Sequence, residues 1–329
     1  MAFLYIVVAL VLIFDFINGF HDSANSIATV VSTKVLSPIA AVSMAAFFNF
    51  IAFVIFPLNV AHTMGKGVIN PDVINLTVIA SALIAAITWN LITWWLGLPS
   101  SSSHTLVGGL VGAAVASSGW SSVIMAGVLK IVVFIVIAPL LGMVMSFIIS
   151  AIVIYISRNH SPSGIDKHFR RLQLLSAAAF SLGHGGNDAQ KSMGIIWVSL
   201  IVSGLATKND PIALWIVLSC QAAIALGTLL GGWRIVKTMG QKITKLKPFE
   251  GFCAESAGAI TLFGATHFGI PVSTTHVITG AIIGAGARKG VSAVKWGVTT
   301  KIFWAWILTI PVSAIVSSSM FLLLNWILS

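Results

Sequence analysis

Charged residues are scarce in this sequence. Only 8% of its 329 residues are Asp, Glu, Lys or Arg, while 57% are hydrophobic and the mean hydropathy is +1.02. A soluble domain carries about 25% charged residues, so the composition excludes one. Residues 73–129 and 302–329 contain no charged side chain, and a membrane-spanning helix needs roughly 20 apolar residues. Because the short alternating segments of a β-barrel are absent, we predict an all-α polytopic membrane protein.

Cysteine is also scarce, and no cleavable leader is apparent. Cys220 and Cys253 both lie in apolar runs, where free cysteines behave as small buried hydrophobes, so neither a disulfide framework nor a cysteine-based metal site is expected. The first apolar stretch lacks a basic start and a small-residue cleavage site. We expect it to be retained as the first membrane segment.

The basic residues are confined to a few stretches, although the net charge is +10. Lys66 and Lys208 fall in other loops, and Lys130 and Lys191 lie inside apolar runs. The remaining fourteen Lys and Arg fall at Lys34 and in the stretches 158–171, 234–247 and 288–301. By the positive-inside rule, these stretches face the cytoplasm. The positive charge therefore indicates topology, and no nucleic-acid partner is expected.

Two motifs occur twice, in the same order. NGFHDSANS (18–26) matches HGGNDAQKS (184–192), which pairs Asp22 with Asp188 at a spacing of 166 residues. GLPSSSSHTLVGGLVGA (97–113) matches GIPVSTTHVITGAIIGA (269–285), which pairs His104 with His276 at a spacing of 172. We therefore predict two homologous membrane repeats, 1–157 and 172–329, joined by a short cytoplasmic linker, 158–171.

Each repeat offers five apolar segments. Their approximate cores are 2–33, 37–58, 74–96, 98–117 and 122–157 in the first, and 172–205, 211–233, 250–266, 271–287 and 298–328 in the second. Because five is odd, the second repeat enters the membrane from the opposite side, which gives inverted topology. With the linker in the cytoplasm, both termini are predicted to be extracytoplasmic.

Broken helices and re-entrant hairpins are expected within this fold. The first segment of each repeat is long and carries its Gly-rich motif in the middle, so we expect two half-helices there. Short Gly-Leu-Pro and Gly-Ile-Pro connections join the next pairs, 74–117 and 250–287. Each pair is either two full crossings or a hairpin that returns to the same side, since charge counting does not distinguish them.

Two Asp residues at membrane depth predict an ion path. A carboxylate there costs several kcal/mol and usually marks a route for ions or substrate. Asp22 and Asp188, with Asn25 and Asn187, are therefore candidates for binding the coupling cation. The coupling cation is either Na⁺, held at Asp22, Asn25 and Asp188, or a proton carried by the carboxyl groups. Lys191 is a supporting residue beside Asp188.

The Ser/Thr-rich motifs predict an anion site. A Pro followed by hydroxyl residues suits the first turn of a helix, and a helix N-terminus favours negative charge through its free N–H groups and its dipole. Two such ends are expected to face each other across one oxyanion, with His104 and His276 as supporting residues. The candidate ligands of this anion are Ser101, Ser102, Ser103, Ser273, Thr274 and Thr275.

Other interpretations of these residues stay open. The hydroxyls are also typical of helix packing, and the Asp188–Lys191 pair is also typical of a helix surface. Asp15 and Lys130 lack a repeat counterpart, which favours structural or interfacial roles. Serine near histidine is compatible with a nucleophile, but no carboxylate in those motifs orients the histidine, so no enzyme is expected. His184 and Asp188 are a thin ligand set for a divalent metal.

The motifs resemble those of the inorganic phosphate transporter (PiT) family. NGFHDSANSIAT, SLGHGGNDAQKSMG, GLPSSSSHTLVGG and ATHFGIPVSTTHVITGAIIGAGA carry the resemblance, which covers essentially the whole chain. It implies inverted repeats and import of phosphate by symport with Na⁺ or H⁺, without a further cofactor. By position it implies phosphate contacts at Ser102, Ser103, Thr274 and Thr275, and cation or coupling roles at Asp22, Asn25, Asn187 and Asp188.

The sequence departs from the family pattern at two places. The long central insertion of some members is reduced to about fourteen residues, and Lys191 stands where the first motif has Asn25. An ammonium group only donates hydrogen bonds, so we hypothesise that Lys191 acts as a tethered cation in place of a second Na⁺.

The alternatives within this interpretation are a sulfate permease of the same family and an uncoupled anion channel. The expected setting is the lipid bilayer of a prokaryotic plasma (inner) membrane. The sequence leaves open a homodimer, and also whether phosphate arrives alone or as a metal complex.

Overall fold

The computed structural model describes residues 1–64, 67–159 and 161–328. Lys66, His160 of the predicted linker and Ser329 lie outside the described residues. Within that part of the chain there is no β-strand beyond an isolated Ile69–Val123 bridge. The long helices are α1 (Ala2–Ser32), α2 (Pro38–Ile51), α4 (Leu76–Leu96), α5 (Ser102–Ser118), α6 (Met125–Ser157), α7 (Pro162–Val202), α8 (Leu214–Leu230), α10 (Pro248–His267), α11 (Thr274–Ala287) and α12 (Trp296–Leu328).

Shorter helices complete the chain. They are α3 (Asn59–Met64), α9 (Trp233–Lys237), the π-helical turn η4 (Thr238–Lys242), and the 3₁₀ turns η1 (Ala52–Val54), η2 (Pro71–Val73), η3 (Trp120–Ser122) and η5 (Val291–Ala293). The predicted all-α membrane architecture is confirmed. Most of the predicted linker 158–171 belongs to a helix, because α7 already begins at Pro162, where Ser161 caps it.

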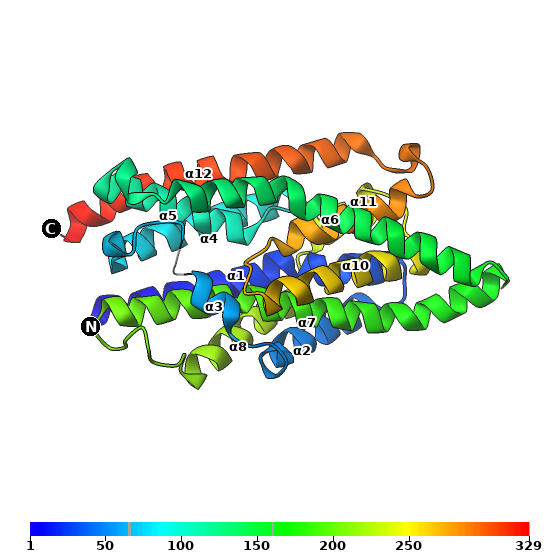
Figure 1. Ribbon diagram of the computed structural model, residues 1–329, viewed down its shortest axis with the longest axis horizontal. Coiled ribbons are helices and arrows are strands. Elements are labelled where there is room, and N and C mark those ends of the chain that lie inside the picture. Colours follow the sequence, from blue (N-terminus) through cyan, green and yellow to red (C-terminus); the bar gives the residue numbers. More distant parts are fainter. Residues whose placement is uncertain (65–66, 160, 329) are drawn as a thin grey trace.

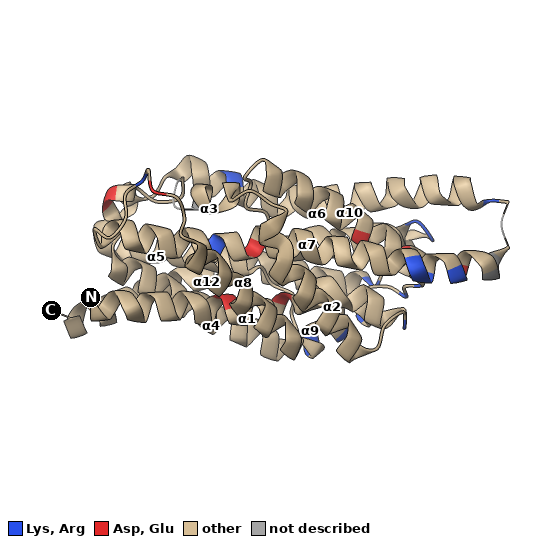
Figure 2. Cartoon of the chain, turned by 90° about the horizontal axis from the view of Figure 1, so that it is seen from below, with Lys and Arg blue, Asp and Glu red and all other residues tan. Residues whose placement is uncertain are grey.

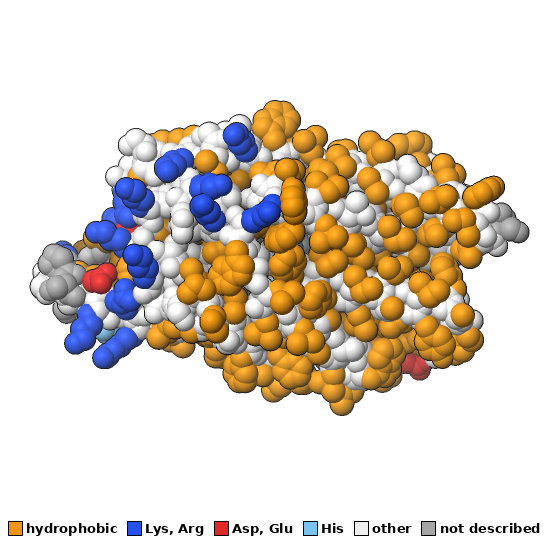
Figure 3. All heavy atoms as spheres, turned by 180° about the vertical axis from the view of Figure 1, so that it is seen from behind, with side chains coloured by type: hydrophobic (Ala, Val, Ile, Leu, Met, Phe, Trp, Pro, Cys, Tyr) orange, Lys and Arg blue, Asp and Glu red, His pale blue; other side chains and the backbone are white. Residues whose placement is uncertain are grey.

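The helices lie roughly parallel to the long axis of the molecule (Figure 1). Among the described residues, α1, α4, α6 and α12 are long and apolar enough to cross a membrane. Helix α8 and the α9–η4 segment, which is bent by 60° from it, together make a fifth candidate. In the apolar stretches of α6 and α12 only 22% of residues are buried. Apolar side chains cover most of the face shown in Figure 3, as expected for a surface in contact with lipid tails.

The basic residues gather at one end of the molecule. Most Lys and Arg lie at the end away from the N and C labels in Figure 2, and they cluster at the same end in Figure 3. This is the distribution that the charge pattern of the sequence predicted. The two chain ends lie together at the opposite end (Figure 1).

Helix α1 runs unbroken through its motif, as does α7. The expectation of two half-helices there is wrong. The glycines serve close packing instead: a Cβ on Gly19 would lie 2.1 Å from the Ile224 carbonyl oxygen of α8, and one on Gly185 would lie 2.4 Å from the Asn49 oxygen of α2. Because glycine lets backbones approach closely, each motif helix is seated against a neighbour.

The chain is interrupted instead at two tight hairpins. Gly97, with φ of 67°, ends α4, and Gly269, with φ of 66°, follows α10. The left-handed backbone that glycine adopts readily lets a second helix start five residues later in each case. In Figure 1, α4 and α5 occupy the half of the molecule nearer the termini, and α10 and α11 occupy the other half. Each pair forms a hairpin whose tip lies toward the middle of the molecule. The choice between two full crossings and a re-entrant hairpin stays a prediction, since of these four helices α4 alone is long and apolar enough to cross a membrane.

The last helix of each predicted repeat packs against the hairpin of the other. Helix α12 lies along α5, and α6 lies along α11. A Cβ on Gly112 of α5 would meet the Ala314 oxygen of α12 at 2.0 Å, and one on Gly284 of α11 would meet the Met143 oxygen of α6 at 2.2 Å. Each hairpin is thus packed against a helix of the other predicted repeat, and this packing positions the hairpin tips.

Candidate functional site

The first turns of α5 and α11 meet at the centre of the molecule. Ser101 Oγ accepts the backbone N–H of His104, and Ser273 Oγ accepts that of His276, each at 3.3 Å. The rings of His104 and His276 lie 4.7 Å apart between centroids. Two capped helix N-termini therefore stand side by side, as the two Ser/Thr motifs predicted.

The α1 motif reaches the first turn of α11. Asn25 Nδ2 donates to Thr275 Oγ1 at 2.9 Å and to Thr274 Oγ1 at 3.4 Å. Thr275 Oγ1 donates to Asp22 Oδ2 at 3.4 Å. Asp22 also accepts a 2.6 Å bond from His21 Nδ1. All of these side chains are buried, so the Asp22 carboxylate lies next to the helix end.

The α7 motif reaches both helix ends. Lys191 Nζ donates to Asp188 Oδ1 at 2.6 Å, to Ser103 Oγ at 2.5 Å and to the Val272 carbonyl at 2.9 Å. Thr274 Oγ1 donates to Asp188 Oδ2 at 3.1 Å. Asp188 and Lys191 are 2% and 3% exposed, so the interpretation as a surface ion pair is wrong. The ammonium uses all three of its donors on oxygen atoms.

Two of these contacts occupy corresponding positions in the repeated motifs. Asn25 and Lys191 are 166 residues apart, and Ser103 and Thr275 are 172 apart. The bonds Asn25–Thr275 and Lys191–Ser103 are therefore counterparts, and each joins a motif helix of one part to a hairpin of the other. The site is built across both halves of the chain, with an amide at one position and a cation at the other.

Three groups suited to a cation converge beside the threonines. Asp22, His184 and Asp188 each offer a ligand atom, and these atoms all lie within 4.8 Å of one another. His184 Nε2 is 3.3 Å from Asp188 Oδ2. The two Asp residues meet as predicted, and Asp22 adds a third ligand to the thin His184–Asp188 set.

Some predicted residues take other positions. Asn187 Nδ2 donates to Thr266 Oγ1 at 3.1 Å and to the Ile270 carbonyl at 3.3 Å, so its amide nitrogen braces the α10–α11 turn. His276 packs on Trp306 with 3.9 Å between ring centroids, and neither of its ring nitrogens has a hydrogen-bond partner. Among the described residues, ring packing is what holds this histidine.

His21 is a site residue that the sequence interpretation did not single out. Besides Asp22, it contacts Thr93 Oγ1 at 3.1 Å and Ser100 Oγ at 3.3 Å, so it joins α1 to the turn between α4 and α5. His184, which was considered as a metal ligand, also joins two helices, because it contacts Asn49 Oδ1 of α2 at 3.2 Å. The sequence feature that could have identified His21 is its position within a repeated motif.

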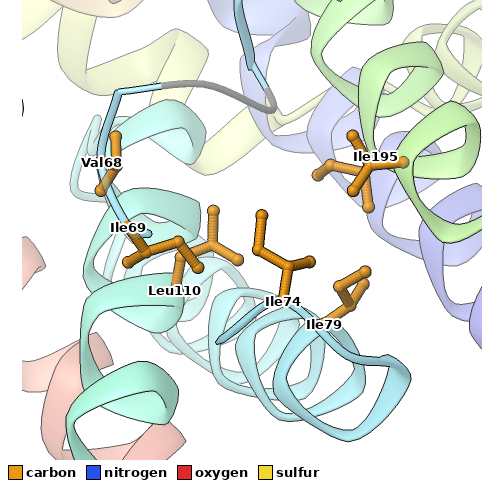
Figure 4. Close-up of a pocket in the computed structure, with 7 residues that line it drawn as sticks. Val68, Ile69, Ile74, Ile79, Leu110 and Ile195 are labelled. Carbon is orange, nitrogen blue, oxygen red and sulfur yellow. The ribbon is translucent and has the colours of Figure 1, made fainter. Parts of the chain in front are cut away.

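A cavity of about 590 Å³ adjoins the helix ends. Ser103, His104, Val272 and Ser273 line it together with Lys130 of α6, so it borders the two capped turns. The smaller pocket in Figure 4, about 30 Å³, is lined only by apolar side chains, among them Ile74, Ile79, Leu110 and Ile195. It offers no polar group to an anion. The larger cavity is therefore the one of these two that borders the site.

Comparison with known proteins gives one consistent result. A family model described as "Phosphate transporter family" matches residues 18–163 and 154–317. A "Probable low-affinity inorganic phosphate transporter" of Rhizobium meliloti (strain 1021) is 57% identical over 94% of this chain and 93% of its own length. One of the same description from Bacillus subtilis (strain 168) is 44% identical over 98% of this chain and 97% of its own.

A solved structure titled "The sodium-dependent phosphate transporter" matches the fold with a TM-score of 0.88 at 28% identity, over 99% of this chain and 100% of that one. The resemblance seen in the motifs is thereby confirmed. Because the family consists of transporters, the expectation that the chain is not an enzyme holds as well. The chain belongs to the phosphate transporter family.

Proposed function

We propose that this protein imports inorganic phosphate by symport with a cation. The observation that carries the proposal is the convergence of two helix N-termini, of α5 and α11, on Asp22 and Asp188. Helix N-termini favour an anion, while the carboxylates favour a cation. A site that offers both is suited to taking the two together.

Phosphate binds between the hydroxyls of the two first turns. Its ligands are Ser102, Ser103, Thr274 and Thr275, together with free N–H groups of α5 and α11, while Ser101 and Ser273 cap the helices and shape the site. Ser102 Oγ is buried without a hydrogen-bond partner, so it is free to donate. Neutral donors hold the anion and still release it. His104 and His276 support this arrangement through their ring contact.

The charges of the site favour coupling to a cation. Two carboxylates and a phosphate dianion outweigh the single ammonium of Lys191, and uncompensated charge at membrane depth is costly. Na⁺ held at Asp22, Asn25 and Asp188, or protons on the carboxyl groups, compensate it. The similar solved structure is titled sodium-dependent, which supports Na⁺. Lys191, with three oxygen contacts, supplies one fixed positive charge.

The charge distribution supports a proposal for the membrane setting. The protein lies in a prokaryotic plasma membrane as two inverted repeats, 1–157 and 172–329, with its basic end in the cytoplasm and both termini outside. Rocking of the repeats about the central site alternates access. We also propose that the protein forms a homodimer in the membrane.

The test is uptake of radiolabelled phosphate into proteoliposomes with an imposed Na⁺ or pH gradient. Uptake driven by one gradient, unaffected by excess sulfate and lost in Asp22→Asn and Asp188→Asn, supports symport and identifies the coupling ion. Competition by sulfate would show that the protein is a permease for a broader range of anions. Uptake that ignores both gradients would assign a channel and overturn the proposal.

A further inference from the structure

Asp15 is a buried carboxyl group on α1 with little hydrogen-bond support. It is 0% exposed, neither of its oxygens makes a hydrogen bond of full geometry to a described residue, and the Ser192 hydroxyl of α7 is its polar neighbour. The other buried carboxyl groups are satisfied: Glu255, for example, accepts bonds from Thr29 and Ser176 at 2.5 Å and from Gln173 at 3.0 Å. The expectation that Asp15 is interfacial is wrong, because it lies away from the surface, while a structural role stays a prediction.

The surroundings of Asp15 contain further unpartnered polar atoms. Ser192 of α7 is the polar neighbour of Asp15, and its hydroxyl is 0% exposed with no other hydrogen-bond partner among the described residues. Asn18, one turn along α1, has an unpartnered Oδ1. On α8, Cys220 lies near Asp15, and both amide atoms of the adjacent Gln221 are buried without partners. A lone carboxylate in such a place costs several kcal/mol unless it binds a cation.

A proton is the simplest cation for Asp15. Among the described residues, the cluster of three His, Cys, Asp or Glu ligands is Asp22, His184 and Asp188, and Asp15 is not part of it. A single carboxyl group is sufficient for a proton, whereas Na⁺ at Asp15 would also need oxygen ligands such as those of Asn18, Ser192 and Gln221. The response of uptake to each gradient separates the two.

Few ionisable groups face Asp15. Asp188 and Lys191 of α7 and Cys220 of α8 lie close enough to interact with it electrostatically. Helices α2 and α4, which also pack on α1, contain no ionisable residue. On α1 itself the nearest ionisable residues along the chain are His21 and Asp22. Asp15 is therefore linked electrostatically to the Asp188–Lys191 pair of the phosphate site.

We propose that Asp15 is a proton-binding site that couples protons to phosphate through Ser192 and Lys191. This rests on the proposed symport. An O–H bond forms at Asp15 with a proton taken from water on one side of the membrane, and it breaks to release the proton on the other. Protonation removes a negative charge from near Lys191, which favours phosphate binding. By thermodynamic reciprocity, bound phosphate then favours the proton.

The variants Asp15→Asn and Asp15→Glu test this in proteoliposomes, with Asp72→Asn as the control for loss of an exposed carboxylate. In Asp15→Asn, which resembles the protonated acid, uptake driven by a pH gradient falls at least about tenfold while exchange of internal for external phosphate continues. Asp15→Glu retains the response to the pH gradient, and Asp72→Asn matches the parent protein. An unchanged pH response in Asp15→Asn overturns the proposal.

Infrared difference spectroscopy between low and high pH provides a second test, which does not depend on transport. The parent protein should show a C=O band of a protonated carboxyl group that titrates, and this one band should shift in Asp15→Glu and be lost in Asp15→Asn, while bands of other carboxyl groups remain. A spectrum in which Asp15→Asn loses no band, or parent uptake that follows the Na⁺ gradient alone, contradicts a proton site at Asp15. Absence of any phosphate uptake by the parent protein would instead overturn the proposed function and leave the infrared result to decide on Asp15.

Discussion

The α1 and α7 motifs bear the same carboxylate at corresponding positions but surround it differently. Asp22 is bonded to His21 and lies beside the amide of Asn25, whereas Asp188 is bonded to the ammonium of Lys191. Asn25 and Lys191 each donate to a hydroxyl on the hairpin of the other part of the chain. The two parts thus share a geometry but differ in charge. One side carries a built-in cation, and in our proposal the other binds a mobile one.

Removal of the α7 carboxylate should have the largest effect. Asp188→Asn leaves the buried Lys191 without its counter-charge, and removal of one partner of a buried ion pair costs about 3–5 kcal/mol. We expect phosphate uptake to fall on the order of 100-fold or more and the melting temperature to drop. Asp22→Asn should reduce uptake with less loss of thermal stability, because no ammonium depends on Asp22. Equal loss of stability in the two variants would remove the distinction between the motifs.

Lys191→Asn makes the α7 motif resemble α1 and tests the built-in cation. Because the fixed charge is gone, uptake should require a higher concentration of the coupling cation, by about tenfold, a shift that corresponds to 1.4 kcal/mol. The measurement is uptake as a function of Na⁺ concentration and of pH. The conservative variant Lys191→Arg serves as the control that keeps the charge. Cation dependence that does not change in Lys191→Asn would refute the tethered-cation hypothesis.

The hydroxyls at the two helix ends should contribute comparably to phosphate binding. Hydrogen bonds to charged groups contribute about 1.5–3 kcal/mol, so Ser103→Ala and Thr275→Val should each raise the KM for phosphate about tenfold or more, with smaller changes in maximal rate. Exposed Ser121 provides a control in Ser121→Ala. An unchanged KM in both variants would place phosphate elsewhere.

The smallest effect is expected at the helix caps, where the two parts are alike. Ser101 and Ser273 make the same 3.3 Å capping bond, and loss of a cap costs about 1 kcal/mol. Ser101→Ala and Ser273→Ala should therefore lower the melting temperature by similar, small amounts. A large difference between them would show that the two helix ends are not equivalent.

The sequence predicted much of this arrangement because repeated motifs constrain it. Spacing alone paired Asp22 with Asp188 and the serine-rich turn with the threonine-rich turn, and these residues meet at the site. The structure does not have the predicted break at the glycines of α1 and α7. In a sequence, a glycine that interrupts a helix and one that lets two helices approach look the same, and only the position of Ile224 or Asn49 distinguishes them.

Partners distant in the chain account for the rest. His21 gains its role from Thr93 and Ser100, and Asn187 turns toward Thr266. The isolation of Asp15 is a property of its surroundings in space. None of these is encoded in the local pattern around the residue.

The most direct test of the account is an experimental structure of the protein with phosphate in a lipid environment. We predict density for one phosphate between the first turns of α5 and α11, within hydrogen-bond distance of Ser102, Ser103, Thr274 and Thr275. Phosphate bound away from these turns, with α5 and α11 otherwise positioned as described, would contradict the central claim that two helix ends form the anion site.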